Sequence, residues 1–188
     1  CLDDDQQLIV ETVRKLSERE LRAWAADADR AGTPPDRLTS VAGDLGFFVD
    51  AVPAEAGGLL DGPYSHTTRA LRGYELGRGC AAIAALLECN VEPALTMGAW
   101  GSAAAKQALF GSLAKGGFAT LYHDSRGALT LDGDRVTGKI IAPALAVASH
   151  VLIAAGDRLL LVPTEGAKRD PITPSGWRAA RWATATLE

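Results

Sequence analysis

Apolar side chains recur at helical spacing through the first 117 residues, and at strand spacing after that point. The first amphipathic pattern predicts one long helix with a continuous apolar face, for which Asp3-Asp4-Asp5 supplies the N-cap and first-turn acids. That face is made of Ile9, Val13, Leu16, Leu21, Trp24, Ala25 and Ala28. Gly32 ends this helix, and Pro34-Pro35 begin a second one. We expect the second helix to bury Leu38, Val41, Ala42 and Leu45 and to end at Gly46.

Three further helices are predicted before Gly117. The first runs from about residue 65 to 78, with Leu71, Tyr74 and Leu76 facing inward. The next covers about 81 to 99 and is apolar almost all round, which is typical of a central helix; Pro93 should bend it. The last spans Ala103 to Leu113, with Ser102 as N-cap, and its inward residues are Leu109, Phe110 and Leu113.

The remaining sequence predicts strands. Residues 118–122 form the first, and 128–140 form a hairpin around Asp132-Gly133-Asp134, because Gly accepts the positive φ of a tight turn. A second hairpin joins 151–155 to 158–162 around Gly156-Asp157. Near the end, 177–182 reads as an extended piece, although 178–187 could equally start a helix. The predicted fold class is α+β: an N-terminal all-helical bundle, residues 1–117, followed by a small antiparallel β-barrel-like domain, residues 118–188.

Composition excludes several classes of function. A net charge of -4, a pI near 5.4 and the lack of a Lys/Arg cluster argue against a nucleic-acid partner. The longest apolar run, Cys80 to Leu87, falls far short of the roughly 20 residues that span a bilayer, so no membrane span is expected. The cysteines, Cys1, Cys80 and Cys89, leave one unpaired and favour a reducing, cytoplasmic location.

The sequence predicts no catalytic residue and no metal ligand set. Glu55, Glu75 and Glu88 are single carboxylates without a visible partner. His150 has no nucleophile motif beside it and reads as a residue at a strand edge. The three histidines are too scattered for metal ligation. Gly57-Gly58 follows no strand and lacks the Lys of a phosphate loop.

Several motifs, in order along the chain, resemble one known family. Asp44-Leu45-Gly46-Phe47-Phe48 is similar to the family's Leu-Gly-Leu turn. Residues 53–59 are similar to its P-E-x-x-G-G-L-G loop, and residues 74–78 are similar to its E-E-L-A/G-R helix end. Trp100-Gly101-Ser102, with Lys106-Gln107 and Leu113, resembles a later F-G-T/S stretch, and Leu131 to Lys139 resembles L-x-G-x-x-L-x-G-x-K. The family is that of the acyl-CoA dehydrogenases.

The resemblance implies a flavoprotein that oxidises the α,β carbon-carbon bond of an acyl thioester. A carboxylate base takes the α-proton and FAD takes the β-hydrogen as hydride. The substrate would be acyl-CoA or an acyl-carrier thioester, in fatty-acid or related lipid metabolism. The family's C-terminal helical bundle, which carries the base and builds the oligomer, has no counterpart here. We therefore expect an incomplete β-domain and no oxidoreductase activity on CH-CH donors from these 188 residues alone. The expected partner is a second dehydrogenase-like subunit, in a homo- or hetero-oligomer.

The positions that would face FAD differ from the family pattern. In place of T-E-P-x-x-G-S-D the chain reads Leu121 to Gly127, where Tyr122, His123 and Ser125 are the candidate cofactor-binding residues. In place of W-I-T/S-N, Ile141 replaces the aromatic ring and Pro143 the hydroxyl donor. The alternative is therefore a non-catalytic, flavin-free homologue that pairs with an active dehydrogenase subunit. A stand-alone lipid-binding or scaffold module is a third possibility.

Overall fold

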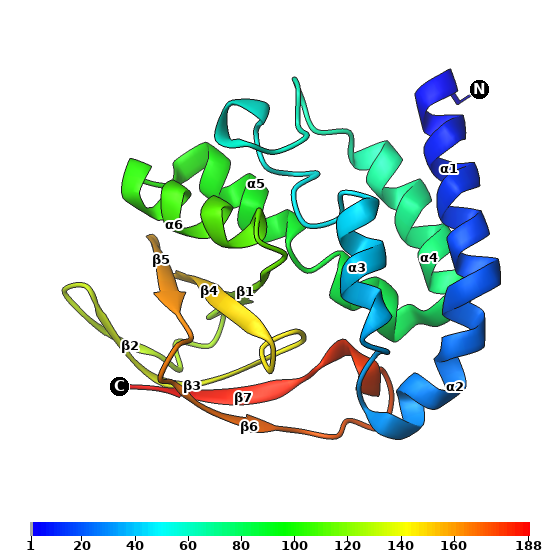
Figure 1. Ribbon diagram of the computed structural model, residues 1–188. Helices are drawn as coiled ribbons and strands as arrows, with labels where there is room; N and C mark the ends of the chain where they lie inside the picture. Colours follow the sequence, from blue (N-terminus) through cyan, green and yellow to red (C-terminus); the bar gives the residue numbers. More distant parts are fainter. Residues whose placement is uncertain (1) are drawn as a thin grey trace.

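The computed structural model describes residues 2–188, so Cys1, grouped above with the other cysteines, lies outside the described residues. Helices occupy the chain as far as Leu113, and strands begin at Phe118. Figure 1 shows the helices stacked along one side and above two small sheets. The predicted fold class, helices followed by a small, mainly antiparallel β region, is confirmed.

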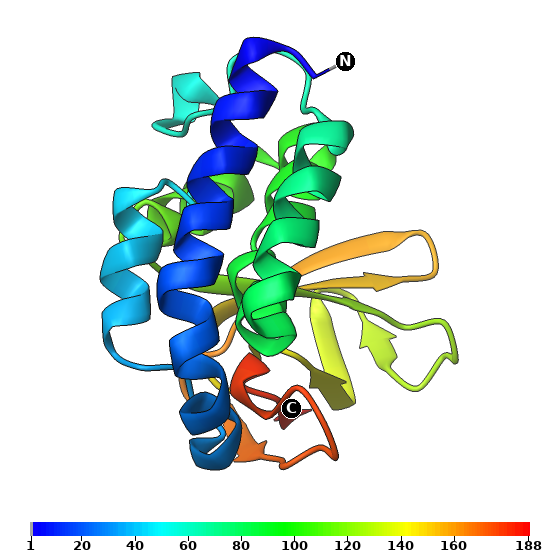
Figure 2. The same ribbon diagram turned by 90° about the vertical axis from the view of Figure 1, so that its right-hand side faces the viewer.

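The first predicted helix is continuous but contains a change of geometry. It consists of α1 (Asp4–Leu16), a π-helical segment (Ser17–Leu21) and α2 (Arg22–Ala31). Asp3 caps α1: its carboxylate accepts the N–H of Gln6 at 2.8 Å, and the Gln6 side chain reaches back to the N–H of Asp3. Figure 2 shows α1 and α4 side by side. Helix α4 also packs closely on the π-helical segment at Gly79, where a Cβ atom would lie 2.5 Å from Ser17 Oγ.

Helix α3 (Arg37–Asp44) is short and buries Leu38 and Ala42. The prediction that Leu45 shares this buried face is wrong: Leu45 is 41% exposed, because the helix has ended and its C-cap backbone is no longer helical. The chain then folds back in a loop that includes a short 3-10 turn (Ala54–Ala56). Gly58 packs against this loop so closely that a Cβ would fall 1.9 Å from the Val52 carbonyl oxygen.

Two helices form the centre of the helical block. Helix α4 (His66–Leu87) is interrupted at Cys80, whose φ of -157° and ψ of 108° are not helical, close to the predicted boundary. Helix α5 (Val91–Trp100) starts after an unpredicted break at residues 88–90. Pro93 therefore lies in the first turn of α5, where proline is tolerated, and does not bend a longer helix. Tyr74, predicted to be buried, is 67% exposed.

Length and composition alone would allow the 66–100 stretch to cross a membrane, but 56% of its apolar window is buried inside the molecule, as in a core helix. Helix α6 (Ala103–Leu113) matches its prediction in both bounds. Ser102 Oγ accepts the N–H of Ala105 at 3.3 Å, and Leu109, Phe110 and Leu113 are buried.

The β region contains two sheets. One has the order β1 (Phe118–His123), β4 (Ala148–Ala155), β5 (Arg158–Pro163); the other has the order β2 (Thr130–Asp132), β3 (Arg135–Ala142), β7 (Ala183–Leu187), β6 (Lys168–Pro171). Both predicted hairpins are confirmed, with Asp132 opposite Arg135 and Ala155 opposite Arg158. The barrel-like prediction needs correction, because the two sheets do not close into a barrel and β1 pairs with β4 in parallel.

The last residues combine the two alternatives left open by the sequence. A short 3-10 turn (Arg178–Ala180) is followed by a strand, β7, which pairs with β3 and β6. Ala179 and Ala180 of this turn, with Ala144, are fully buried in the same apolar cluster as Leu16, Leu21 and Leu76 of the helices. The helical and β regions therefore share a core.

Candidate functional site

The predicted cofactor-binding residues lie at the end of β1. Tyr122 is opposite Ile153 and His123 opposite Ala154 in the parallel pairing with β4. The next residue, Asp124, donates its N–H to the Ala154 carbonyl at 2.8 Å and ends the strand. The site is thus anchored by the sheet on one side and opens into the 124–129 turn on the other.

This turn satisfies its own polar groups. The Asp124 carboxylate accepts the N–H groups of Ala128, at 2.8 Å, and Leu129, at 3.0 Å. These hydrogen bonds, that from Ala128 first, lower the pKa of Asp124. The sequence reasoning missed Asp124, although an Asp that begins a turn before Gly is a known signal for this kind of side-chain-to-backbone bond.

The structure brings Tyr122, His123 and Ser125 into one short segment but does not organise them into a binding site. Tyr122 is half-buried against the apolar cluster of the sheets. His123 and Ser125 are exposed, and within residues 2–188 their side chains make no hydrogen bond. They remain accessible donors without a fixed geometry.

The second predicted segment lies at the end of β3. Ile140 and Ala142 are buried, so alternation along the strand turns Ile141 outward, where it is 48% exposed. Ile141 offers no aromatic face, and the ring nitrogen of Pro143 carries no hydrogen to donate. The residues present at these two strand ends therefore do not fit the flavin contacts of the family pattern.

Asn90 positions β1 against the helices. Its Nδ2 donates to the Gly117 carbonyl at 3.2 Å, and its Oδ1 accepts the N–H of Ala119 at 2.7 Å. Cys89 and Asn90 were expected in the middle of a helix; they lie instead in the break between α4 and α5. Burial raises the pKa of the Cys89 thiol, so this cysteine is a neutral, packed side chain and not a nucleophile.

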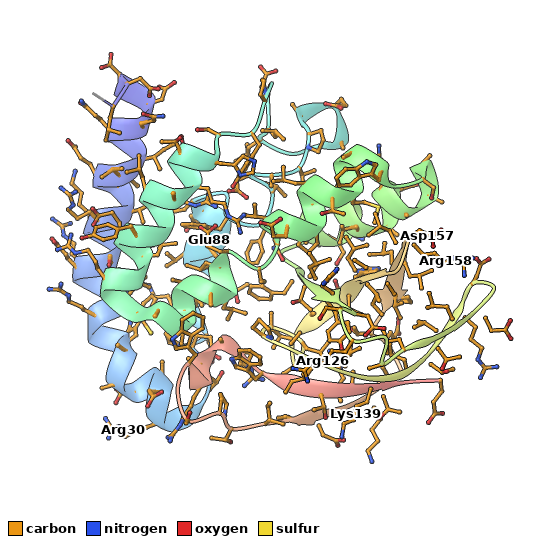
Figure 3. All side chains as sticks on the ribbon, turned by 180° about the vertical axis from the view of Figure 1, so that it is seen from behind. Arg30, Glu88, Arg126, Lys139, Asp157 and Arg158 are labelled. Atoms are coloured by element: carbon orange, nitrogen blue, oxygen red, sulfur yellow. The ribbon has the colours of Figure 1, made fainter. Side chains whose placement is uncertain are left out.

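A second polar centre joins α4 to the 47–64 loop and the start of α5. Arg72 donates to both Glu88 oxygens, at 2.7 and 3.0 Å, and to Asp50, and its guanidinium carbon lies 5.0 Å from the Phe47 ring centroid. Figure 3 shows Glu88 among these helices. Burial raises the pKa of Asp50 against the opposing effect of Arg72. With every basic group paired, this centre is structural.

His150 takes part in a third polar group that is also structural. Ser149 Oγ lies 2.6 Å from Ser112 Oγ, donates to the Phe118 carbonyl at 3.1 Å and lies 3.0 Å from His150 Nδ1. Burial lowers the pKa of His150. With all these contacts the hydroxyl of Ser149 fastens α6 and β1 to β4, and the expectation that His150 is not catalytic stays a prediction.

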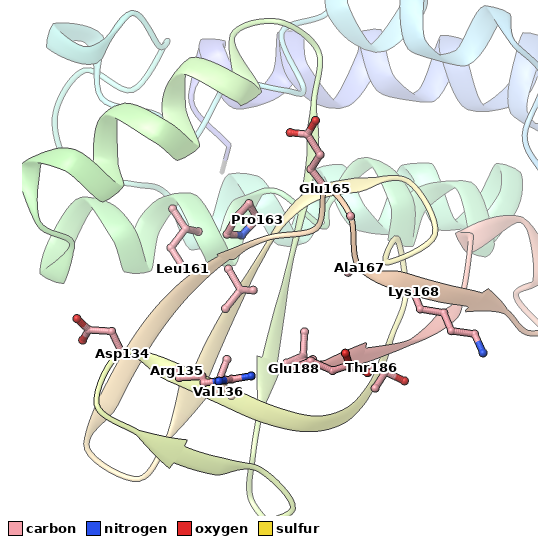
Figure 4. A pocket seen from close by; sticks show the side chains of 13 residues that line it. Asp134, Arg135, Val136, Leu161, Pro163, Glu165, Ala167, Lys168, Thr186 and Glu188 are labelled. Carbon is pink, nitrogen blue, oxygen red and sulfur yellow. The ribbon is translucent and has the colours of Figure 1, made fainter.

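A cavity of about 790 Å³ is an open groove between the edge strand β5 and the ends of β3, β6 and β7. Figure 4 shows its lining, which includes Arg135, Glu165, Lys168 and Glu188. None of the predicted cofactor-binding residues lines it. Across residues 2–188 there is also no group of three or more His, Cys, Asp or Glu side chains arranged to hold a metal ion.

Comparison with solved structures first defines the fold. Butyryl-CoA dehydrogenase from Megasphaera elsdenii matches 100% of this chain, with a TM-score of 0.81 and 16% identity. A glutaryl-CoA dehydrogenase from Mycobacterium smegmatis, solved with FADH2, matches 100% of it, with a TM-score of 0.80 and 20% identity. The chain covers 56% and 53% of these two structures.

The sequence comparisons then define the family. The model described as "Acyl-CoA dehydrogenase, N-terminal domain" matches residues 3–117. Cyclohex-1-ene-1-carbonyl-CoA dehydrogenase from Syntrophus aciditrophicus is 32% identical over 106 residues, which is 56% of this chain and 25% of that protein. The chain belongs to the acyl-CoA dehydrogenase family, and it spans a quarter to about half the length of these relatives.

Proposed function

We propose that this chain forms the helical and β walls of an acyl-thioester site in an acyl-CoA dehydrogenase-type oxidoreductase. The observation that carries the proposal is the preserved order of helices and sheets along the whole chain, together with the family match over residues 3–117. The relatives named above are dehydrogenases of CoA thioesters, which supports an acyl-CoA or acyl-carrier thioester as substrate. When bound, FAD would supply the hydride acceptor for α,β-dehydrogenation, in fatty-acid or related lipid metabolism in the cytoplasm.

Within that function, the side chains favour a subunit that does not hold its own flavin. Ile141 and Pro143 supply no contact of the family type, and the Asp124 carboxylate is occupied by the backbone of its own turn. A flavin-free homologue that pairs with an active dehydrogenase-like subunit is therefore the second candidate. The two candidates share the fold and differ in flavin content.

Flavin absorbance of the purified chain distinguishes the two candidates. We expect a colourless protein that binds added FAD weakly or not at all. A yellow protein, with a flavin band that survives gel filtration, would contradict the flavin-free role and support a self-contained flavin site.

Restoring the missing groups provides the matched test. The double variant Ile141→Trp and Pro143→Thr should raise the affinity for FAD by at least about tenfold, because it returns a stacking ring and a hydroxyl donor. Leu159→Trp, on β5, is the control, since Leu159 is a similarly exposed apolar strand residue outside both segments. Equal gains in both variants would show only that added tryptophan attracts the flavin ring.

The natural context is tested on protein isolated from its own cells. A 19.6 kDa chain that copurifies with a flavin-containing, dehydrogenase-like chain supports the subunit role. A longer polypeptide with one flavin and its own acyl-CoA oxidation, measured with an electron-accepting dye, supports a single-chain dehydrogenase. If no such preparation oxidises an acyl thioester, the enzymatic proposal fails.

A further inference from the structure

A small, positively charged cavity lies where the end of α2, the turn after β3 and the end of β6 meet. Its volume is about 170 Å³. Figures 1 and 2 both place the end of α2 beside the 178–180 turn in the lower part of the molecule. The lining residues are Ala31, Gly32, Ala146, Pro171, Ile172, Thr173, Arg178, Arg181 and Trp182. This corner directly follows the 141–143 segment along the chain and contains none of the residues assigned to the flavin.

The lining carries two positive charges and no acid. Within residues 2–188 neither Arg178 nor Arg181 forms an ion pair, although the chain as a whole is acidic, with a net charge of -4. The only side-chain hydrogen bond of either guanidinium there is from Arg178 Nε to the Pro174 carbonyl, at 3.4 Å. Both arginines are half-buried, where an uncompensated charge is costly.

Trp182 adds a donor without a partner. Its Nε1–H is buried and forms no hydrogen bond within the described residues, while its ring packs against the helical core. A buried indole N–H normally finds an acceptor, because leaving it unpaired costs about 1–3 kcal/mol. The cavity offers the guanidinium groups of Arg178 and Arg181 and the Thr173 hydroxyl, while the Trp182 ring forms part of its wall and keeps its N–H buried behind it.

The backbone of this corner is held in an unfavourable conformation. The non-glycine residues with positive φ in the described chain are Ala144, Trp177 and Arg181, with φ of 59°, 57° and 57°. All three belong to the segments that meet here: the Ala144 N–H donates to Ala180 at 2.7 Å, and the Ala146 N–H to Arg181 at 3.1 Å. Such outliers cost free energy and are found preferentially at ligand-binding positions.

We propose that this cavity binds a phosphate-type oxyanion. A tetrahedral oxyanion accepts hydrogen bonds on several sides at once, which matches the guanidinium and hydroxyl donors. The volume is several times the roughly 30 Å³ that a water molecule occupies, yet below the roughly 300 Å³ at which pockets for larger organic ligands begin. The ligand is therefore inorganic phosphate or the phosphate end group of a larger molecule. The proposal does not rest on the acyl-thioester function.

The test titrates the 188-residue chain with inorganic phosphate at constant ionic strength. Calorimetry and ³¹P NMR measure the binding. We expect saturable binding with a dissociation constant on the order of 1 mM. Arg178→Gln with Arg181→Gln should weaken it at least about tenfold, because each removes a charged donor. The matched control is Arg126→Gln with Lys139→Gln, which removes two exposed positive charges of the β region, both labelled in Figure 3, and should leave binding unchanged.

Trp182→Phe keeps most of the ring and removes only the indole N–H, which has no accessible surface, so binding should stay within about twofold of the wild type and far above that of the arginine variants. Far-UV circular dichroism checks that each variant is folded; if the double arginine variant is not, each single arginine variant replaces it. A second titration with phosphoserine distinguishes free phosphate from a phosphate end group, and tighter binding of either one supports the proposal. No binding of either compound up to about 10 mM, or equal binding by the arginine variants and their control, overturns it.

Discussion

The helical and β regions use their charged side chains in different ways. Every ion pair within the described residues joins side chains of the helical block, from residue 14 to residue 92. In the β region three arginines donate to backbone carbonyls instead: Arg158 to Gly133 at 2.7 Å, Arg169 to Leu145, Ala146 and Ala148, and Arg178 to Pro174. Backbone groups inside a helix are hydrogen-bonded to one another, so charged side chains are left to pair between helices. The irregular segments between strands have carbonyl groups without backbone partners, which accept hydrogen bonds from side chains.

The largest difference is expected between Arg72 and Arg169. Arg72→Gln should lower the free energy of unfolding by about 3–5 kcal/mol, because it leaves Asp50 largely buried without a cation and Glu88 with Arg69 alone. Arg169→Gln should cost only about 1 kcal/mol, since carbonyl groups lose one of several possible partners. Urea denaturation of both variants measures this. Equal losses would remove the distinction between the two regions.

Asn90 tests the connection between the regions. Asn90→Ala should cost about 1–3 kcal/mol, because it leaves the buried N–H of Ala119 and the carbonyl of Gly117 without partners. Asn90→Asp keeps the acceptor for Ala119 but places a buried carboxylate against the Gly117 carbonyl, so at neutral pH its thermal midpoint should lie no higher than that of Asn90→Ala. If Asn90→Ala unfolds like the wild type, water replaces this link at no cost.

The substitution Gly→Ala should change the free energy of unfolding in opposite directions in the two regions. At Gly133, in the β2–β3 turn, φ is +57° and a Cβ would meet no atom within 4 Å, so Gly133→Ala should cost about 1–2 kcal/mol through backbone strain alone. At Gly111, in α6, the space is equally open and the backbone is helical, so Gly111→Ala should gain about 0.5–1 kcal/mol. Shifts in thermal midpoint of the same sign would contradict this.

The smallest expected effects concern pH and salt. Both Glu75 and Asp124 have a lowered pKa. The pKa of Glu75 is lowered by hydrogen bonds from Arg14 and Arg78, of which that from Arg14 has the larger effect, and burial opposes this lowering. The pKa of Asp124 is lowered by hydrogen bonds from backbone N–H groups. For each, the stabilisation is complete above the unfolded pKa, 4.5 or 3.8, and is lost as the pH falls through the lower folded pKa.

The comparison is between the wild type and Glu75→Gln or Asp124→Asn, by unfolding between about pH 2 and 6. The stability difference should shrink toward low pH in both cases. Added salt should reduce the stability difference between the wild type and Glu75→Gln, because the arginine partners of Glu75 are part-exposed. The difference between the wild type and Asp124→Asn should stay nearly unchanged. Asp134→Asn, in the neighbouring hairpin, is the control, and a pH response equal to that of Asp124→Asn would show that the turn bonds do not matter.

The sequence was sufficient wherever a local signal defines an element. Helix α6 matched because Ser102 caps it, and both hairpins matched because Asp-Gly and Gly-Asp favour tight turns. The break at residues 88–90 was missed because a bend at Pro93 was expected, whereas Asn90 and Pro93 mark the start of α5. Strand β6 was missed because Lys168 to Pro171 is a polar edge strand without apolar alternation. The parallel pairing of β1 with β4 depends on contacts between distant segments.

The candidate site stays a prediction. Tyr122 and His123, at the end of β1, and Ser125, just after it, belong to one of the two strand ends that the family resemblance indicates for a flavin. The resemblance marks the position alone. It could not indicate that Asp124 closes the adjoining turn on itself. The cavity beside Trp182 had no sequence signal, because its two arginines and its indole are brought together with α2 only by the fold.

The three alanines that the β region contributes to the helical core have a consequence for motion. Ala144, Ala179 and Ala180 are fully buried in the helical core. Their methyl groups are closely packed, so the sheets cannot slide over the helices without disturbing this contact. Hinge or shear movement between the helices and the sheets would have to open this contact and expose apolar surface. Conformational responses of this chain to a ligand are therefore expected in its loops, with the helical and β regions moving as one body.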